Sequence, residues 1–310
     1  MTLYRVYGLI ISSEFPLPEL FRAPANSKAD VVIRLGSVDA LEPGKQIAFE
    51  RGEVRLQFED AGRFRAAGGT AIDVDPNPGA TAEAIRIYLL GSVLGAIMHQ
   101  RGLLPLHSNA VVLDGRAVAF AGPPGAGKST LAAWFHDLGD NLLSDDVCVI
   151  AWDDGVPLAF PGVPRLRLWR DSLEATGRLA ADHAQAFDGF EKFLVGARSG
   201  AQTSPAPLSH VYLLRPADGD GPEIERLGGS AAVQTLSENT YRGTYLSDLG
   251  ATERHFQQCC ALADAVPVYI LKRQLGFTRM KADVRHVRDH ARSVIRARDD
   301  GDALAGQGRQ

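Results

Sequence analysis

A glycine-rich segment in the middle of the chain has the residue types needed to bind phosphate. Residues 122–129 read Gly-Pro-Pro-Gly-Ala-Gly-Lys-Ser and fit the pattern G-x-x-x-x-G-K-[ST]. Glycines let the backbone N–H groups of such a loop turn towards phosphate, while the lysine and serine can contact phosphates and Mg²⁺. A glycine-rich turn with no ligand is the alternative. We predict that ATP binds to Gly122, Pro123, Pro124, Gly125, Ala126, Gly127, Lys128, Ser129 and Thr130.

Two adjacent aspartates follow this segment closely. Asp145 and Asp146 come 17 and 18 residues after Lys128, beyond a predicted helix and a short apolar stretch. The chain should therefore bring them back to the phosphate end of the site. Because side chains alternate along a strand, one carboxylate can accept a proton from an attacking hydroxyl while the other holds a metal ion. A solvated loop pair or a helix N-cap is the alternative.

The elements around the glycine-rich segment predict an α/β core with a mixed sheet. Apolar runs at 108–113 and 117–121 flank Asp114-Gly115, a dipeptide suited to positive φ, so they should form an antiparallel hairpin. A helix is expected at 128–138, directly after the loop. A two-residue turn leaves no room for a helical crossover, so the sheet cannot be all parallel. Further strands are expected at 147–152, 211–214 and 266–271.

The pattern along the chain predicts two domains. The first 80 residues contain short β-branched and aromatic runs broken by Gly, Pro, Asn and Asp, and a helical pattern follows from about 81 to 100. Gly91 and Gly95 in this helix predict close packing of another helix. The predicted parts are an N-terminal β-rich domain (1–80), a connecting helix (81–103), a P-loop core (104–278), a basic helix (279–300) and a disordered tail (301–310). Strands in the first part are expected at 3–11, 31–35, 47–49, 54–58 and 71–74.

The bulk composition argues against several classes of protein. With 33 Lys+Arg against 37 Asp+Glu, the net charge of −4 offers no general attraction to nucleic acid or an anionic membrane. Three cysteines cannot form a disulfide framework, which indicates a reducing compartment. The most apolar stretch, 87–98, is too short to span a bilayer. We expect a cytoplasmic protein that binds neither nucleic acid nor membrane, and a homo-oligomer is left open.

Several of these segments together resemble the catalytic core of the HPr serine kinase/phosphorylase family. The nucleotide-binding core of that family is similar to that of phosphoenolpyruvate carboxykinase. The resemblance covers about residues 103–160 and implies a P-loop kinase core with a mixed sheet. It implies that His107 is an active-site histidine, that Asp145 is the proton acceptor for a substrate serine, and that Lys128 is catalytic. The matching segments are Leu106-His107-Ser108, the Asp114-Gly115 hairpin, residues 121–129 and Leu143-Ser-Asp-Asp146.

Two regions depart from that family. Its magnesium-binding Glu lies in a Glu-x-Arg-Gly-Leu-Gly-like segment, whereas the comparable residues 161–171 here read Pro-Gly-Val-Pro-Arg-Leu-Arg-Leu-Trp-Arg-Asp. Asp171 is the candidate substitute, and a helix N-cap is its alternative role. The family also uses an arginine near the reacting phosphate, for which Lys192 and Arg198 are candidates by region. The predicted metal ligands are Ser129, Asp146 and Asp171.

Segments outside the core resemble the HPr-kinase-like proteins associated with lasso peptide biosynthesis. Members with an assigned role phosphorylate a serine of the precursor peptide, so the resemblance implies an ATP- and Mg²⁺-dependent serine kinase acting on a peptide or small protein. A kinase for small-molecule hydroxyls and a nucleotide-gated binding or assembly module with little turnover are the alternatives. The segments that carry the resemblance are 4–8, 13–20, 164–169, 255–256 and 266–269.

The C-terminal region carries a local excess of positive charge. Residues 272–298 contain nine Lys and Arg against Asp283 and Asp289. Such a segment can dock an anionic peptide, and a solvated helix face balanced by acidic neighbours is the alternative. The loop at 196–207, rich in small residues and proline, is a candidate cover for the acceptor.

Overall fold

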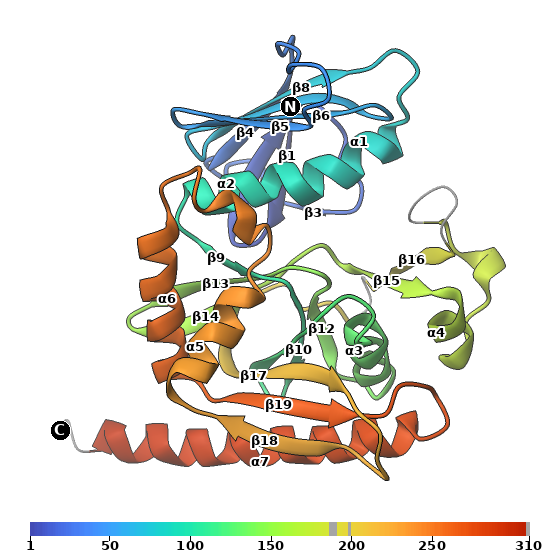
Figure 1. The fold of residues 1–310 in the computed structure, drawn as a ribbon, viewed down its shortest axis with the longest axis vertical. Coiled ribbons are helices and arrows are strands. Elements are labelled where there is room, and N and C mark those ends of the chain that lie inside the picture. The colour runs from blue at the N-terminus through green and yellow to red at the C-terminus, as the bar shows by residue number, and fades with distance from the viewer. Residues whose placement is uncertain (186–190, 198–199, 308–310) are drawn as a thin grey trace. The chain divides into compact units, whose positions relative to one another are not determined.

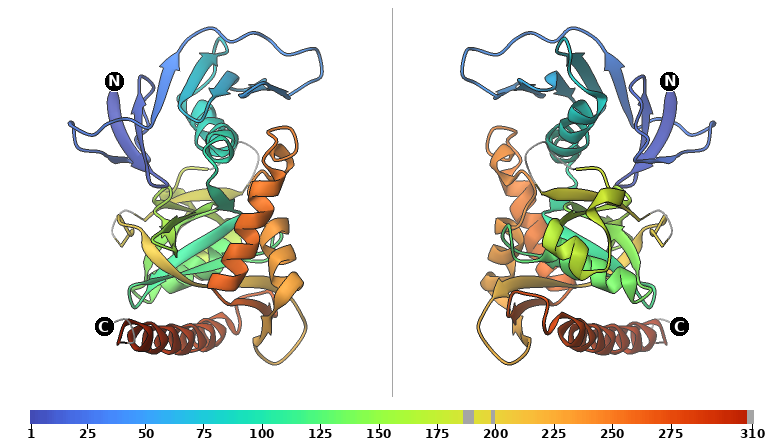
Figure 2. Two further views of the ribbon diagram at one scale, coloured as in Figure 1. Left: turned by 90° about the vertical axis from the view of Figure 1, so that its left-hand side faces the viewer. Right: turned by 90° about the vertical axis from the view of Figure 1, so that its right-hand side faces the viewer.

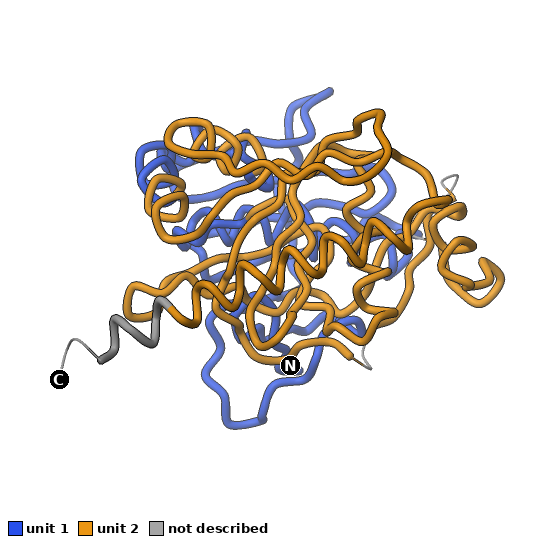
Figure 3. Tube along the Cα trace, turned by 90° about the horizontal axis from the view of Figure 1, so that it is seen from below, with its two compact units in different colours: residues 1–105, 240–258 blue, residues 106–239, 259–310 orange. Residues whose placement is uncertain are grey.

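The chain forms two compact units in a computed structural model that describes residues 1–310 except 186–190, 198–199 and 308–310. Unit 1 comprises residues 1–105 and 240–258, and unit 2 comprises 106–239 and 259–310 (Figure 3). Strand β9 (Leu104–Leu106) and helix α6 (Thr252–Ala265) each contain a boundary between the units.

Unit 1 is built on an eight-stranded sheet in the order β3-β1-β2-β4-β8-β7-β6-β5 (Figure 1). The β2–β4 and β4–β8 pairs are parallel, and the other pairs are antiparallel. The sequence analysis missed β7, in which Arg63 and Arg65 interrupt the apolar pattern; both form ion pairs with acidic residues of neighbouring strands. The strands are β1 (Thr2–Val6), β2 (Leu9–Ser13), β3 (Phe21–Arg22), β4 (Val31–Leu35), β5 (Ile47–Glu50), β6 (Glu53–Phe58), β7 (Gly62–Ala67) and β8 (Ala71–Pro76).

A long apolar helix belongs to unit 1. It consists of α1 (Ala82–Tyr88), a π-helical turn (Leu89–Val93) and α2 (Leu94–Gln100), and the Thr81 side chain caps its start by accepting from the N–H of Ala84. By length and a mean hydropathy of 1.2 it could cross a membrane, but 67% of its apolar window is buried inside the fold. It is therefore packed as a core helix.

The segment after residue 239 returns to unit 1 and packs on this helix. A Cβ at Gly95 would lie 3.2 Å from side-chain atoms of both Tyr241 and Arg242, so the close approach predicted at Gly95 is made by this segment and not by a second helix. The N–H of Tyr241 donates to the carbonyl of Pro105 at 2.8 Å, and its carbonyl lies 2.8 Å from His99 Nε2. These contacts explain why 240–258 clusters with unit 1, whereas the sequence analysis placed it in the core.

Unit 2 contains the mixed sheet that the sequence predicts. The sheet runs β12-β10-β11-β17-β14-β13, and β19 also pairs with β17 and carries β18 on its other side. The predicted hairpin is confirmed, since β10 and β11 pair antiparallel with φ values of 48° at Asp114 and 81° at Gly115. The β11–β17 and β17–β19 pairs are parallel. The strands are β10 (Ser108–Leu113), β11 (Arg116–Ala121), β12 (Asn141–Ser144), β13 (Cys148–Asp153), β14 (Val156–Phe160), β17 (Ala206–Pro216), β18 (Glu223–Leu227) and β19 (Val268–Arg273).

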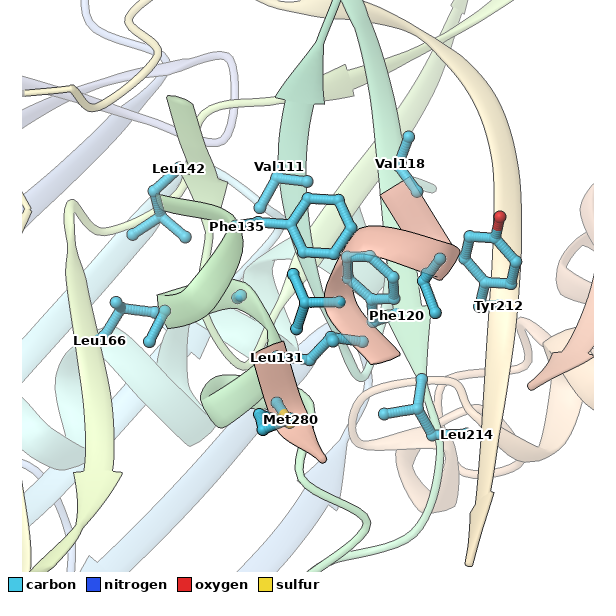
Figure 4. Close-up of a cluster of buried hydrophobic side chains, with 14 of the residues drawn as sticks. Val111, Val118, Phe120, Leu131, Phe135, Leu142, Leu166, Tyr212, Leu214 and Met280 are labelled. Atoms are coloured by element: carbon cyan, nitrogen blue, oxygen red, sulfur yellow. The ribbon is translucent and has the colours of Figure 1, made fainter. Parts of the chain in front are cut away.

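Helices and a small second sheet complete unit 2. Helices α3 and α7 join one apolar core with the sheet, centred on Phe120, Leu131 and Phe135 (Figures 2 and 4). The antiparallel pair β15–β16, missed in the sequence analysis, adds Leu166 and Leu168 to this core. The remaining elements are α3 (Lys128–Asp137), β15 (Arg165–Trp169), α4 (Arg170–Ala175), a 3₁₀ turn (Ala180–Asp182), β16 (Lys192–Gly196), α5 (Gly229–Glu238) and α7 (Met280–Gln307), with a 3₁₀ turn (Gly243–Tyr245) in unit 1.

Helix α7 is longer than predicted. It extends to Gln307, so the prediction of a disordered tail is wrong for 301–307, while 308–310 lie outside the described residues. The stretch contains alanine and leucine, which are strong helix formers and allow the helix to continue past Gly301.

A buried histidine supports the contact between α7 and the sheet. His210 on β17 is fully buried beside Tyr212, whose hydroxyl lies 2.6 Å from His290 Nδ1 on α7. Burial lowers the pKa of His210 to about 3, with smaller effects from the charges of His290 and Arg298. His210 is therefore neutral in the folded protein near pH 7.

Acid should therefore destabilise unit 2 through His210. His210 is protonated near pH 6.5 in the unfolded chain and only near pH 3 in the folded unit. The free energy of unfolding therefore has its full value above pH 6.5 and falls as the pH drops from 6.5 towards 3. Within this range, each drop of one pH unit lowers the free energy of unfolding by about 1.4 kcal/mol. We expect the unfolding free energy of the wild type to fall by about 2 kcal/mol more than that of His210→Gln between pH 7.5 and 5. Urea titrations followed by tryptophan fluorescence report on unit 2, which contains all three tryptophans. Equal losses in the two proteins would contradict this account.

Candidate functional site

Unit 2 contains a cavity of about 430 Å³ at the glycine-rich loop. Its walls come from five places: the residue before β10, the glycine-rich loop with the start of α3, the segment after β12, the β15–β16 pair with α4, and the end of β19 with the loop that follows. The lining side chains include His107, Lys128, Ser129, Thr130, Asp146, Arg167, Trp169, Asp171, Lys192, Arg273, Leu275 and Phe277. Residues far apart in sequence therefore meet in one place.

The glycine-rich loop has the strand–loop–helix setting that the motif requires. It connects β11 to α3, and Gly127 caps the helix with φ 84°. Gly122, with φ 141°, lies so close to β17 that a Cβ there would be 2.9 Å from the Leu214 carbonyl oxygen. Both positions need glycine, because other residues rarely adopt these φ values. The N-terminus of α3 faces the loop and provides positive potential for an anion.

Lys128 is held inside the loop. Its ammonium donates to the carbonyl of Gly122 at 2.7 Å and to that of Pro123 at 3.3 Å. The residue is 8% exposed, and burial lowers its pKa against the raising effect of Asp146 and Asp145. The ammonium thus donates to neutral carbonyl oxygens. A phosphate oxygen, which is charged and accepts more strongly, can replace them.

Asp145 is a buried connector and does not line the cavity. One oxygen, Oδ1, accepts from Ser129 Oγ at 3.0 Å and from Asn109 Nδ2 at 2.5 Å, and Oδ2 accepts from the N–H of Arg167 at 2.8 Å. Its side chain is 3% exposed, and burial raises its pKa despite the nearby Arg167 charge. The carboxylate links α3, β10 and β15 at the end of β12.

Asp146 faces the cavity, because the chain turns at this residue with φ 71°. Its carboxylate accepts from the Arg167 guanidinium, and its Oδ1 lies 3.5 Å from His107 Nδ1. Burial raises its pKa, but the charges of Arg167 and Lys192 and the Arg167 hydrogen bond outweigh burial, so the pKa is lowered. Asp146 is therefore ionised at neutral pH.

His107 is neutral at pH 7. Burial lowers its pKa and the charges of Lys128 and Arg167 act in the same direction, against the raising effect of Asp146. Its Nδ1 also lies 3.0 Å from the Asp146 carbonyl oxygen. These contacts orient the ring beside Asp146.

The β15–β16 pair supplies a basic wall. Leu166 and Leu168 point into the core, so the alternating residues Arg167 and Trp169 point the other way. Lys192 lies opposite Trp169 in the register, with its ammonium 5.6 Å from the indole ring centroid. Burial and the Arg167 charge lower the pKa of Lys192.

The remaining predicted residues differ in placement. Asp171 lines the cavity. It lies in the first turn of α4, where its Oδ1 accepts from the N–H of Ser172 at 2.6 Å, but the N-cap is Trp169, so the alternative role of Asp171 as an N-cap is wrong. Arg198 lies outside the described residues. Across the described part of the chain, no group of three or more His, Cys, Asp or Glu could hold a metal ion by itself.

Three residues of the site escaped the sequence analysis: Asn109, Arg167 and Arg273. Asn109 is a polar residue inside the apolar run of β10, which is the signal that could have identified it. Arg167 alternates with leucines in a strand pattern. Arg273 lies two residues beyond the end of the strand predicted at 266–271. Nothing in its local sequence distinguishes it from a surface arginine.

Several of the positive charges near the C-terminus form ion pairs within unit 2. Arg288 donates to both oxygens of Asp140 at 2.7 and 2.8 Å, Arg292 pairs with Asp114, and Lys272 pairs with Glu223 and Glu225. This pairing favours a balanced helix face over a docking surface.

Comparisons with known proteins find distant similarity to solved structures. No family model matches the chain, and no curated protein matches it. Among solved structures, the chain is similar to the Hpr(Ser) kinase/phosphatase from Coxiella burnetii, with 14% sequence identity and a TM-score of 0.35. That alignment covers 64% of this chain and 97% of the other. The function proposed below rests on the residues of the cavity.

Removing the Lys128 charge should weaken nucleotide binding without unfolding unit 2. Lys128→Met keeps much of the side-chain volume and loses the ammonium, so we expect the Kd for ATP to rise about 10- to 100-fold. Isothermal titration calorimetry measures the Kd, and circular dichroism checks the fold. Lys281→Met, on the exposed surface of α7, is the matched control and should bind like wild type. ATP binding by folded Lys128→Met at the wild-type level would show that the loop does not bind phosphate.

Proposed function

We propose that the protein is a kinase that transfers the γ-phosphate of ATP to a hydroxyl group. The observation that carries the proposal is the meeting, in one cavity, of the glycine-rich loop with Lys128 and an ionised carboxylate, Asp146. The first binds and neutralises phosphates, and the second can accept a proton from the attacking hydroxyl. Phosphoryl transfer needs both functions beside each other.

The geometry favours Asp146 over Asp145 as the proton acceptor. Both oxygens of Asp145 already accept hydrogen bonds from Ser129, Asn109 and the Arg167 N–H, and the side chain is closed off from the cavity. Asp146 lines the cavity, where a substrate can reach it. We therefore reverse the roles that the family resemblance implies for the two aspartates.

Ser129 lines the cavity and is the candidate Mg²⁺ ligand, and the buried Asp145 would act through its hydrogen bond to Ser129. Mg²⁺ is usually bound by one or two protein oxygens together with substrate phosphates and water, and the Ser129 hydroxyl lies 3.0 Å from the Asp145 carboxylate at the phosphate loop. When bound, Mg²⁺ neutralises charge on the transferring phosphates. Asp171 lines the same cavity and is the further candidate ligand.

The other polar side chains position the base and neutralise charge. Arg167 and His107 hold the Asp146 carboxylate on two sides, so that its orientation is fixed before the hydroxyl arrives. Lys192 lies in the same wall, where its charge would stabilise the transferred phosphoryl group.

For the acceptor, we propose a serine of a peptide or small protein, with a lasso precursor peptide as the specific candidate. The sequence resemblance supports this choice. Trp169, which is 47% exposed at the cavity, gives an extended chain an aromatic surface to contact. A small-molecule hydroxyl is the second candidate, and a nucleotide-gated module with little turnover is the third.

Incubation with Mg²⁺ and ATP separates these candidates. Mass spectrometry would follow a serine-containing precursor peptide and an extract of small metabolites incubated with the protein. A gain of one phosphate on the peptide is expected. Phosphate appearing only on a metabolite would favour the small-molecule kinase, and ATP binding with no phosphorylated product would favour the nucleotide-gated module.

The two aspartates should fail in different ways when changed to asparagine. Asp146→Asn keeps the shape and loses the proton acceptor, so we expect phosphoryl transfer to fall about 10²- to 10⁴-fold with the Kd for Mg·ATP nearly unchanged. Asp145→Asn should instead raise the Kd for Mg·ATP more than the Kd for ATP in the presence of EDTA. Transfer rates and calorimetric Kd values measure both effects.

The opposite pattern would restore the original assignment. If Asp145→Asn lost transfer while keeping Mg·ATP affinity, and Asp146→Asn lost Mg·ATP affinity, Asp145 would be the base. Thermal melting of both variants provides the control, because Asp145 holds three elements together and its change could loosen the fold.

A further inference from the structure

The strand order fixes the direction in which a nucleotide would lie, given the proposed function. In the sheet, β12 and Asp146 lie on one side of β11, and β17 and β19 lie on the other. The glycine-rich loop follows β11 and so lies between them. If the γ-phosphate faces Asp146, the nucleoside must extend towards the end of β19. That end of the cavity is formed by Arg273, Leu275, Gly276 and Phe277.

Arg273 is a buried cation at the β19 end of the cavity. The residue is 3% exposed, and within the described part of the chain no carboxylate forms an ion pair with it. Its Nη2 and Nη1 make long contacts, 3.4 Å each, with the carbonyls of Ala126 and Gln274, and Nη1 also lies 3.6 Å from Met280 Sδ. Its Nε is buried with no hydrogen-bond partner. Burial lowers its pKa, although Asp283 acts in the opposite direction.

Such a group is costly unless an anion joins it. A guanidinium has five donors, and leaving a buried charge unpaired is strongly unfavourable. Arg273 lies outside the motif in sequence but contacts the glycine-rich loop. Its Nη2 is so close to Gly127 that a Cβ there would clash with it. The position beside Ala126 and Gly127 therefore places an uncompensated positive charge next to the phosphate loop.

The loop after β19 offers an apolar surface next to this charge. Leu275 is 50% exposed although it lines the cavity, and Phe277 lines it as well. Between them, Gly276 adopts φ 116° with open space where a Cβ would lie. An exposed leucine, a glycine and a phenylalanine form a surface suited to a flat aromatic base.

We propose that Arg273 binds the phosphate nearest the nucleoside, and that Leu275, Gly276 and Phe277 hold the nucleobase. Arg273 then provides the second buried cation of the nucleotide site, at the opposite end from Asp146. Because the side chains of Leu275 and Phe277 have no hydrogen-bonding groups, they hold the base by its faces.

The competing explanation is that Arg273 only supports the loop through the Ala126 carbonyl. The two explanations differ in what happens to a ligand without a nucleoside. Inorganic pyrophosphate can occupy the glycine-rich loop but has no nucleoside-side phosphate. Loss of loop support would weaken pyrophosphate and ATP alike, whereas loss of a nucleoside-side contact would weaken ATP selectively.

Calorimetry on the full chain with ATP, ADP and inorganic pyrophosphate tests the proposal. For Arg273→Met we expect the Kd for ATP and for ADP to rise about 10- to 100-fold and the Kd for pyrophosphate to change less than about threefold. Arg292→Met, on α7 and away from the cavity lining, is the matched control. Parallel weakening of all three ligands, or no weakening, would overturn the proposal.

A second variant covers the case in which Arg273→Met does not fold. Leu275→Glu changes a half-exposed side chain and places a negative charge beside the nucleoside end, so ATP affinity should fall at least about fivefold with pyrophosphate nearly unaffected. Leu179→Glu, at a site 67% exposed and outside the cavity lining, is its control. ATP binding by Leu275→Glu equal to that of the control would contradict the proposal.

These results are distinct from a failure of the proposed function. If the unaltered protein binds ATP in the predicted way but transfers no phosphate, the nucleotide subsite stands and the kinase proposal falls. If the unaltered protein does not bind ATP at all, both are refuted.

Discussion

The buried carboxylate of Asp145 is the interaction on which the site depends. It accepts hydrogen bonds from Ser129 at the start of α3, from Asn109 on β10 and from the backbone of β15. Three segments that are distant in sequence are thereby fixed around one point. A carboxyl group buried this deeply needs hydrogen bonds whether it is ionised or protonated, because an unpaired polar group there would strongly destabilise the fold. The position of the glycine-rich loop relative to the basic wall follows from this network.

The arrangement of charges in the cavity follows from the residue after that carboxyl. The left-handed turn at Asp146 points its side chain away from the buried network and towards Arg167 and His107. Two adjacent aspartates thus occupy different environments: burial raises the pKa of Asp145, whereas nearby positive charge lowers that of Asp146. This separation allows one carboxylate to organise the site and the other to remain an ionised acceptor. The cations are also distributed, with Lys128 in the loop, Lys192 on one side and Arg273 on the other.

Local patterns in the sequence were sufficient to predict much of the core of unit 2. The Asp114-Gly115 turn predicted the hairpin, and the position of the glycine-rich motif predicted a strand before it and a helix after it. The strands β7 and β15 were missed because arginines alternate with their apolar residues. The helical extension of α7 past residue 300 was missed because the polar, glycine-containing tail has no clear stop or start signal.

The site was only partly predictable, because some of its residues act through contacts between distant segments. The roles of Asp145 and Asp146 depend on the turn at Asp146 and on Arg167, and neither can be read from two adjacent aspartates. Arg273 comes to the loop through the parallel pairing of β17 with β19, which no local pattern indicates. Conversely, Arg288 and Arg292 of α7 pair with Asp140 and Asp114, which are distant in sequence, so this charge balance could not be read from the α7 segment alone.

The most direct test of this account is a crystal structure of the protein with Mg²⁺ and a non-hydrolysable ATP analogue. The account predicts the β- and γ-phosphates at Lys128 and the glycine-rich loop, the γ-phosphate facing Asp146, and the nucleoside at Arg273 and Leu275. A nucleotide in the reverse direction, or one bound away from this loop, would contradict it.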